Sequence, residues 1–360
     1  MNEPATPALI VDLPTVERNL RSMAEYAAAH RLALRPHSKT HKSLRLARLQ
    51  MACGAVGLTV AKVGEADVMA RAADDVLVAY PAVDVARCRA LARLAAEHAI
   101  SVALDSAQAI EAIGAAVSRA GSTVGILIEL DAGFHRTGVQ SPEASLALAR
   151  RAAAAKGVRL DGLMIFPGHL SGIEGQAEEL ARIGELLDRT IELWRRAGLE
   201  ARIVSGGSTP TARRSHLLPS LTEIRPGTYI FNDMKTVAGG HVTVDDCAAR
   251  VCCTVVSDAV PGAVVLDAGS KALSSELLHQ SPDDAYGFVV EHPEGRVVRL
   301  SEEHGVVDVS RCGRRPKVGE RVHVIPNHIC TCVNLFDSMW LRHADGDLEE
   351  TPVDARGRLS

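Results

Sequence analysis

Short apolar runs alternate with helix-forming stretches along the first two thirds of the chain. The runs have the length of buried strands, and the stretches between them carry apolar residues at helical spacing. We count eight runs, at 32–39, 54–60, 74–80, 100–105, 123–130, 160–166, 201–207 and 221–227. The helical stretches include 43–51, 63–73, 85–99, 107–120 and 175–198.

Strands that alternate with helices pair in parallel through right-handed crossovers. Eight such units in about 200 residues match a (β/α)8 TIM barrel. A doubly wound sheet is the rival architecture, although it has less reason to stop at eight strands. We therefore predict an α/β fold with a barrel domain over residues 14–235.

The pattern changes after residue 235, where strand-like segments follow one another with Gly, Pro and Asp turns and little helix between them. These segments are 249–257, 262–270, 286–291, 295–301, 305–310 and 321–327. They predict a C-terminal antiparallel β domain over 236–360. Another strand, at 8–13, precedes the barrel and could join this β domain, so we assign residues 1–13 to it.

The composition limits the classes of partner. The chain has 360 residues, 47% of them hydrophobic and 23% charged, which excludes a disordered protein. A net charge of −4 and 3% aromatic residues give no reason to expect a nucleic acid. No apolar run approaches the ~18 residues of a membrane span, and the acidic start is unlike a signal peptide. We expect a cytoplasmic protein with no membrane partner and with reduced cysteines.

The residues after each barrel strand are the candidates for chemistry, because the active site of a TIM barrel lies at the carboxyl ends of its strands. The first run ends in RPHSKTHK, at 35–42. A lysine shielded in a barrel mouth can act as a Schiff-base nucleophile, so Lys39 is a candidate; a basic loop at the rim is the alternative. The fifth run ends in DAGFHRTG, where Arg136 can donate to an anionic oxygen unless the segment is only a turn.

Small residues follow the last two strands. SGGSTP, at 205–210, follows the seventh run, and RPGTY, at 225–229, follows the eighth. Free N–H groups of small residues at a helix start bind phosphate, and TIM barrels commonly bind phosphate in these two loops. Position and composition therefore agree on a phosphate site.

The β domain carries PNHICTC, at 326–332. His328 and Cys330 are two residues apart, so in a strand both side chains would point to one face. Imidazole with thiolate suits Zn²⁺ and similar metals, and two protein ligands would leave positions open for water and substrate. From spacing alone, a buried cysteine that lies near a histidine by chance is the alternative.

Together these motifs resemble the pyridoxal-phosphate (PLP) enzymes with an alanine-racemase-type barrel, fold type III. The closer resemblance is to the D-threonine aldolase / D-serine dehydratase family. It runs almost end to end, through TPALIVDLPTVERNL, RPHSKTHK, VGEADVMA, DAGFHRTGV, SGGSTP, EIRPGTYIFND, LDAGSKALSSE, LSEEHG and PNHIC.

The resemblance implies roles for individual residues. Lys39 would carry PLP as a Schiff base, and Arg136 would bond the phenolic oxygen of the cofactor. His328 and Cys330 would hold a divalent metal, zinc or manganese. The residues that it places around the phosphate are Gly206, Gly207, Ser208, Thr209, Gly227 and Tyr229. It also implies a homodimer.

The implied function is a lyase that acts on D-3-hydroxy-α-amino acids. We predict retro-aldol cleavage of D-threonine-like substrates to glycine plus an aldehyde, from the overall resemblance. The alternative is β-elimination by a D-serine or D-3-hydroxyaspartate dehydratase, because His-x-Cys and KTHK match the dehydratases whereas the aldolases use His-x-Asp. His169, in FPGHL, is a candidate general base, with a rim or core histidine as its alternative reading.

Two other classes stay open at this point. A metal-free amino-acid racemase would need a second acid/base on the opposite face of the cofactor, which the sequence does not identify. A non-catalytic PLP carrier of this resemblance would lack the C-terminal β domain, so the region around His328 counts against it.

Overall fold

A computed structural model describes residues 4–278 and 285–360, and the chain divides into two units. The first, here the barrel unit, comprises Arg21–Lys39, Leu44–Gly227 and Gly357–Ser360. The second, here the β unit, comprises Met1–Leu20, Thr40–Ser43 and Thr228–Arg356. These units divide the chain at other positions than 13/14 and 235/236, and the domain boundaries drawn from the sequence stay a prediction.

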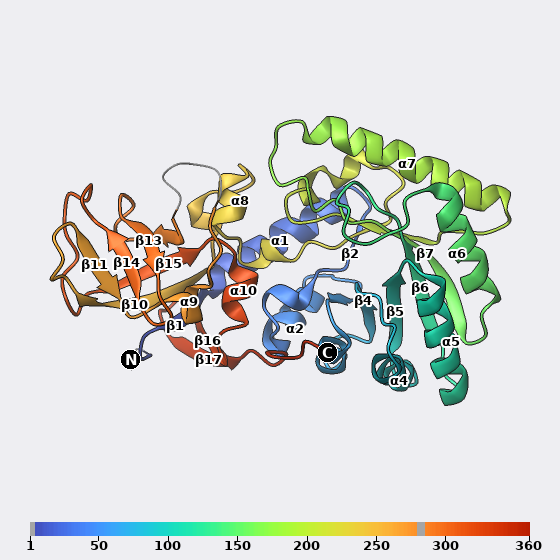
Figure 1. Cartoon of the computed structure of the whole chain (residues 1–360), viewed down its shortest axis with the longest axis horizontal. Helices are drawn as coiled ribbons and strands as arrows, with labels where there is room; N and C mark the ends of the chain where they lie inside the picture. Colours follow the sequence, from blue (N-terminus) through green and yellow to red (C-terminus); the bar gives the residue numbers. More distant parts are fainter. Residues whose placement is uncertain (1–3, 279–284) are drawn as a thin grey trace. The chain divides into compact units, whose positions relative to one another are not determined.

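The barrel unit is built on an eight-stranded parallel sheet (Figure 1). Its strands pair in the order β2-β9-β8-β7-β6-β5-β4-β3, and a parallel bridge between His37 and Thr59 joins the chain after β2 to β3. Each strand overlaps one of the eight apolar runs, so the predicted TIM barrel is confirmed. The strands are β2 (Ala33–Leu34), β3 (Leu58–Val60), β4 (Asp75–Val78), β5 (Ala99–Leu104), β6 (Val124–Glu129), β7 (Val158–Met164), β8 (Ile203–Gly206) and β9 (Glu223–Ile224).

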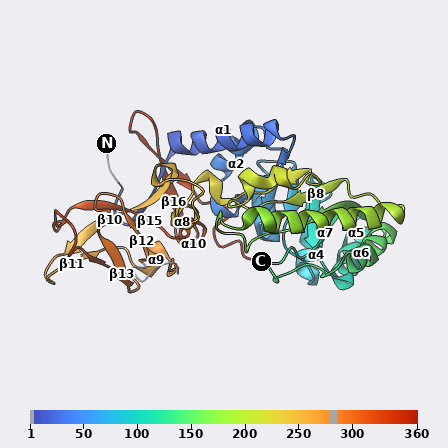
Figure 2. The same ribbon diagram turned by 90° about the horizontal axis from the view of Figure 1, so that it is seen from above.

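Helices connect these strands and cover the outside of the sheet (Figures 1 and 2). Three of them begin at a side-chain cap, since Asp84, Ser106 and Ser141 each accept a hydrogen bond from the backbone N–H three residues on. Gly121, at φ 68°, takes the left-handed conformation that ends α5. The helices are α2 (Leu44–Ala52), α3 (Val63–Met69), α4 (Val85–Leu94), α5 (Ala107–Ala120), α6 (Pro142–Ala154) and α7 (Gln176–Arg196).

The β unit holds a nine-stranded sheet in the order β11-β14-β13-β12-β15-β10-β1-β16-β17, and β11 also pairs with β10. The first strand is antiparallel to β10 and parallel to β16, so the N-terminal strand joins the C-terminal sheet as predicted. The last two strands were not among the segments expected from the sequence. The strands are β1 (Ala8–Asp12), β10 (Ala249–Ser257), β11 (Ala263–Leu266), β12 (Gly287–Val289), β13 (Arg296–Leu300), β14 (Gly305–Asp308), β15 (Arg321–Pro326), β16 (Ser338–Arg342) and β17 (Leu348–Pro352).

The strand geometry that we predicted for the His-x-Cys motif is wrong. Strand β15 ends at Pro326, His328 is the N-cap residue of a short helix, and Cys330 lies within that helix, α10 (Ile329–Val333). The carboxylate of Asp233 accepts a hydrogen bond from the backbone N–H of Ile329 at 3.1 Å. This bond satisfies a helix-start amide that would otherwise have no partner, so the chain turns into a helix instead of extending the sheet.

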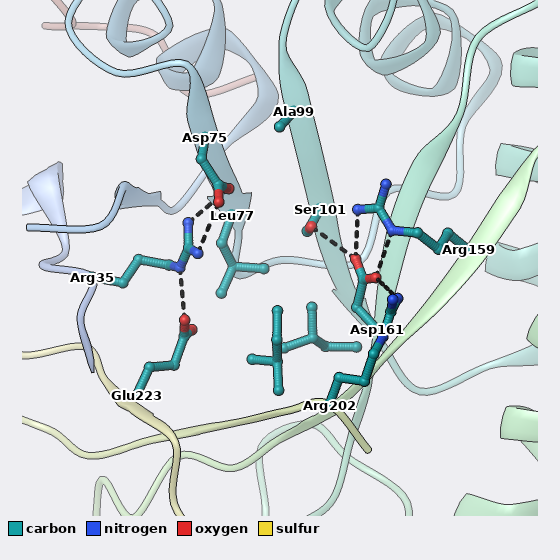
Figure 3. Close-up of a pocket in the computed structure, with 11 residues that line it drawn as sticks. Arg35, Asp75, Leu77, Ala99, Ser101, Arg159, Asp161, Arg202 and Glu223 are labelled. Atoms are coloured by element: carbon teal, nitrogen blue, oxygen red, sulfur yellow. Dashed lines mark hydrogen bonds and ion pairs between the residues drawn. The ribbon is translucent and has the colours of Figure 1, made fainter. Parts of the chain in front are cut away.

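Ion pairs fill the barrel at the amino ends of its strands (Figure 3). Arg35 donates to Glu223 at 2.9 Å and makes a two-pronged pair with Asp75 at 2.7 and 3.0 Å. Asp161 accepts from Arg159 and Arg202 at 2.6 and 2.8 Å. Three cations face three anions around a cavity of about 320 Å³. Because the amino-terminal face of a TIM barrel serves stability, we interpret this network as structural.

Outside the two short gaps in the described chain, we find no helix whose length and apolar character would let it cross a membrane.

Candidate active site

A cavity of about 260 Å³ lies at the carboxyl ends of the barrel strands. Its wall is supplied by segments that follow β2, β3, β4, β6, β7, β8 and β9. This is where the chemistry of a TIM barrel is expected. The residues used below are His37, Lys39, Lys62, Tyr80, Arg136, Phe166, Gly207 and Arg225.

Lys39 is held in this wall by a short turn of 3-10 helix, η1 (Ser38–Thr40), directly after β2. The preceding backbone is fixed, because the N–H of His37 donates to the carbonyl of Pro226 at 2.9 Å. The lysine side chain is half-buried, and its Nζ lies 6.0 Å from the ring centroid of Phe166. Its place at the end of β2 agrees with a Schiff-base role, which stays a prediction.

Arg136 approaches the same aromatic ring from the loop after β6. Its Cζ lies 4.7 Å from the ring centroid of Phe166 and 5.1 Å from that of Phe134. The loop is organised by buried Asp131, whose carboxylate accepts from the backbone N–H groups of Gly133 and His135 at 3.0 and 3.1 Å. The loop geometry therefore positions a guanidinium at the cavity wall, as Arg136 would need to bind an anionic oxygen.

The predicted phosphate residues are only partly brought together. Gly207 lines the cavity, at φ 78°. The backbone N–H of Ser208 donates to Thr211 Oγ1 at 2.9 Å, and that of Gly227 donates to Thr209 Oγ1 at 3.2 Å. The N–H of Ser208 thus has an acceptor within its own loop, whereas the N–H of Gly227 bonds across to the loop after β8. Gly206 ends β8, and Tyr229 is buried within the β unit.

Arg225 is a cavity residue that the sequence reasoning did not single out. Its guanidinium is buried and donates to Ser205 Oγ at 2.6 Å and to the carbonyl of Ile165 at 2.9 Å. Burial lowers the pKa of Arg225 to about 10, so the side chain remains a cation at neutral pH. It adds a hydrogen-bonded guanidinium to the basic side chains of Lys39, Lys62 and Arg136 in the cavity wall.

His169 does not line the cavity. It is exposed and packs beside Gly133, where an added Cβ would lie 3.1 Å from its Cε1. Another histidine of the same region was missed: Nδ1 of His135 lies 2.7 Å from the carboxylate of buried Asp131. The role of His169 as a general base stays a prediction without a cavity contact to support it.

His328 and Cys330 interact within the β unit. Nδ1 of His328 lies 3.1 Å from Oδ2 of Asp233, and Cys330 Sγ lies 3.2 Å from Thr40 Oγ1 and 3.7 Å from Thr228 Oγ1. Burial alone would lower the pKa of His328, but Cys330 and Asp233 raise it to about 10. Among the described residues, no group of three or more His, Cys, Asp or Glu side chains is arranged to hold a metal.

The side chains of His328 and Cys330 nevertheless have the chemistry that a divalent metal such as zinc binds. A carboxylate on Nδ1 orients a histidine and leaves Nε2 available, which is the usual arrangement behind a metal-binding imidazole. The sequence reasoning missed Asp233, Thr40 and Thr228. Asp233 had a readable signal, because it is followed by a helical segment, α8 (Met234–Ala238), as an N-cap is.

The other cavity residues that the sequence reasoning missed share one feature, which is their position directly after a barrel strand. Lys62 follows β3, Tyr80 follows β4 and Phe166 follows β7, each within two residues of the strand end. Lys62 Nζ lies over the ring of Tyr80, 3.5 Å from its centroid. All three thus share with Lys39 a position after the carboxyl end of a barrel strand, where the active site of a TIM barrel lies.

The chain matches two protein-family models. Residues 11–235 match the alanine racemase N-terminal domain, and residues 248–341 match the putative serine dehydratase domain. Among curated relatives, a D-threonine aldolase of Arthrobacter is 32% identical, and the match covers 98% of this chain and 93% of that aldolase. A solved D-threonine aldolase from Filomicrobium marinum superposes with a TM-score of 0.90 at 32% identity, over 99% of this chain and 97% of its own.

A third relative is a dehydratase. The D-threo-3-hydroxyaspartate dehydratase of Delftia is 32% identical and covers 96% of each chain. A solved D-threo-3-hydroxyaspartate dehydratase, a cysteine-to-alanine mutant described as the metal-free form, superposes with a TM-score of 0.86 at 29% identity, over 97% of each chain. Full-length similarity to enzymes of both names, on this fold, shows that the chain belongs to the D-threonine aldolase / D-serine dehydratase family of pyridoxal-phosphate-dependent lyases.

Proposed function

We propose that this protein cleaves D-3-hydroxy-α-amino acids with PLP bound in the barrel cavity. The observation that carries the proposal is that Lys39, Arg136, Gly207 and Arg225 line one cavity at the carboxyl ends of the strands. The relatives that share the whole chain act on D-threonine and on 3-hydroxy-D-aspartate by their names.

The residues present fit the cofactor. PLP is a planar, anionic aldehyde, and the cavity offers a primary amine, two guanidinium groups and the flat ring of Phe166. Gly207, without a side chain and at positive φ, leaves its backbone open to a phosphate. When bound, PLP withdraws electrons from the substrate carbon that loses a bond.

The chain's own groups have separate tasks in this proposal. Lys39 supplies the amine that holds the cofactor and, once released, a base whose Nζ can take or return a proton. Arg136 would donate to the phenolic oxygen of the cofactor, and its guanidinium lies over the ring of Phe166. Arg225 is fixed by two hydrogen bonds and keeps a positive charge in the wall.

We further propose that His328 and Cys330 hold a divalent metal, zinc or manganese. A relative described in a metal-free form after loss of a cysteine supports it, as does the Asp233 carboxylate behind His328. A metal there would supply Lewis-acid polarisation of the substrate hydroxyl.

Retro-aldol cleavage of D-threonine-like substrates is the reaction that we favour, with β-elimination as the second candidate. The aldol reading follows the Arthrobacter and Filomicrobium relatives. A separate observation supports β-elimination: this chain carries Cys330, its Delftia relative is a dehydratase, and a solved dehydratase of the same name in a metal-free form is the mutant of a cysteine.

One assay separates the two reactions. The protein is incubated with PLP, with Zn²⁺ or Mn²⁺, and with D-threonine, D-serine or D-threo-3-hydroxyaspartate. Glycine plus an aldehyde identifies the aldolase, whereas ammonia plus a 2-oxo acid identifies the dehydratase. Interconversion of D- and L-alanine without either product would overturn the lyase proposal. We also propose a cytoplasmic homodimer from the family resemblance, and light scattering of the purified protein tests its oligomeric state.

A further inference from the structure

A cysteine, a histidine and a glutamate form a cluster on the sheet of the β unit, apart from the residues discussed above. We propose that Cys252, His323 and Glu291 are a second, nucleophilic site, at which the thiol exchanges with small disulfides that carry carboxylates. The proposal does not depend on the lyase reaction.

Strand pairing places the nucleophile opposite its base. Cys252 on β10 and His323 on β15 are direct partners in the antiparallel register, on neighbouring strands (Figure 1). Directly opposed residues have Cβ atoms roughly 5 Å apart and side chains on one face. This register places the thiol of Cys252 beside the imidazole of His323.

Glu291 fixes the orientation of that imidazole. Its Oε1 accepts from His323 Nδ1 at 2.6 Å, and its Oε2 accepts from the backbone N–H of the same residue at 2.8 Å. With Nδ1 committed to the carboxylate, Nε2 is the ring atom left for the thiol. A nucleophile beside a base, with a carboxylate that orients the base, is the arrangement that activates a cysteine.

The charges of the cluster favour a protonated imidazole at His323, beside Cys252. Hydrogen bonding and charge from Cys252 and Glu291 raise the pKa of His323 to about 9. Burial would raise the pKa of Glu291, but the hydrogen bonds from His323 lower it, so the carboxylate stays ionised. A protonated histidine beside a cysteine stabilises the thiolate, which is the reactive form.

The cluster lies in the wall of a cavity of about 370 Å³. The other residues of this wall indicate which disulfides the thiol would accept. Cys252 and His323 line it together with two cationic side chains, Arg321 and Arg342, and with apolar Ile10. Arg342 is paired with Asp12 at 3.1 Å, and Arg321 donates to the carbonyl of Pro4 at 3.0 Å. Two guanidinium groups in the wall favour an anionic reagent over a cationic one.

The adjacent cysteine makes the contrast clear. Cys253 points to the other face of β10 and has no exposed surface, and burial raises the pKa of its thiol well above the usual value. All eight cysteines of the chain are free of disulfides. Cys252 is itself buried, with 4% of its surface exposed, but it lines a cavity together with His323.

The step is thiol–disulfide exchange. The Sγ of Cys252 attacks one sulfur of the small disulfide, forming a new S–S bond as the original one breaks. The bonding electron pair leaves with the second sulfur as a thiolate, which takes the proton from the His323 imidazolium. Cys252 ends as a mixed disulfide, and one equivalent of small thiol is released.

The experiment treats the full-length, PLP-loaded protein at pH 7 with oxidised glutathione, which is anionic, or with cystamine, which is cationic. Peptide mass mapping gives the rate of modification at each cysteine, and each rate is divided by that of free cysteine with the same reagent. We expect Cys252 to react first, about tenfold faster than the half-buried Cys53 and Cys312, and to prefer glutathione.

Two variants test the roles of the partners. His323→Gln and the milder Glu291→Gln should each slow modification of Cys252 about tenfold or more, with little change in melting temperature. Cys253→Ser is the matched control and should leave the rate at Cys252 unchanged. The proposal fails if Cys252 reacts no faster than Cys53 and Cys312, if cystamine is preferred, or if folded Glu291→Gln reacts like the parent protein.

Discussion

The guanidinium of Arg136 lies over the ring of Phe166, with Cζ 4.7 Å from the ring centroid. The same ring has the ammonium of Lys39 at 6.0 Å. One aromatic side chain therefore contacts the two cations that we assign to the cofactor, although they come from loops after β2 and β6. Attraction between a cation and an aromatic face amounts to about 0.5–2 kcal/mol, enough to restrict where each cation points.

Replacing the ring of Phe166 should disturb the positions of Lys39 and Arg136 without removing either side chain. We expect Phe166→Leu to keep the visible absorption of the PLP-bound lysine, because Lys39 is intact. Turnover should fall about five- to tenfold, which corresponds to about 1 kcal/mol of lost positioning. Absorption spectra and kcat/KM measure the two effects. Phe288→Leu, in β12 of the other unit, is the control and should match the parent protein.

Lys39→Ala tests the Schiff base itself. The purified parent protein should be yellow, with a visible band from the protonated Schiff base, and the variant should lose both the band and the activity. Lys62→Ala, which removes the other lysine of the cavity wall, is the matched control and should retain the band. A Lys39→Ala protein that keeps band and turnover would show that another lysine holds the cofactor.

Gly207→Ala tests the phosphate loop. At φ 78° an alanine is strained by roughly 1–2 kcal/mol, and its Cβ would lie 3.3 Å from Ser215 Oγ. We expect the affinity for PLP, measured by spectroscopic titration, to fall about tenfold or more. Gly172→Ala is the control, because a Cβ there meets nothing within 4 Å. Equal PLP affinity in both variants would place the phosphate elsewhere.

Chelation tests the metal. Two protein ligands make an open site, whereas a closed structural zinc site has four. EDTA should therefore abolish lyase turnover with little change in melting temperature, and elemental analysis should show loss of metal.

Variants of the two ligands sharpen this test. His328→Ala should reproduce the effect of EDTA. Cys330→Asp should retain metal with preference moved from Zn²⁺ toward Mn²⁺, since carboxylate is the harder ligand. Full activity in EDTA would remove the metal from the mechanism, and unfolding in EDTA would make the site structural.

The ion-pair network at the amino ends of the strands predicts a stability effect. An added Cβ at Gly125 would overlap the carboxylate of Asp161 and the hydroxyl of Ser101. Gly125→Ala should separate Asp161 from its arginines and lower the free energy of unfolding by about 3–5 kcal/mol. Urea denaturation measures this loss. Gly114→Ala, in helix α5 with its nearest neighbour at 3.6 Å, should be neutral or stabilising by up to about 1 kcal/mol.

The sequence by itself determined the two sheets and the position of Lys39. Periodicity is a local property, so alternating apolar runs and helices identify a TIM barrel, and strand ends identify its active-site face. The same local reasoning was wrong about the conformation of the segment that carries His328 and Cys330, which it predicted as a strand. Their segment turns into helix α10 because Asp233, ninety-five residues earlier than His328, accepts the N–H of Ile329.

Only the tertiary structure decided which side chains meet. Phe166 joins Lys39 to Arg136, and Cys252 faces His323, through contacts between segments far apart in the chain. No local pattern encodes such a contact, because it depends on strand register and on how each loop closes over the barrel. The sequence thus determined the fold and the candidate lysine, and the packing of distant segments determined its neighbours and the second thiol cluster.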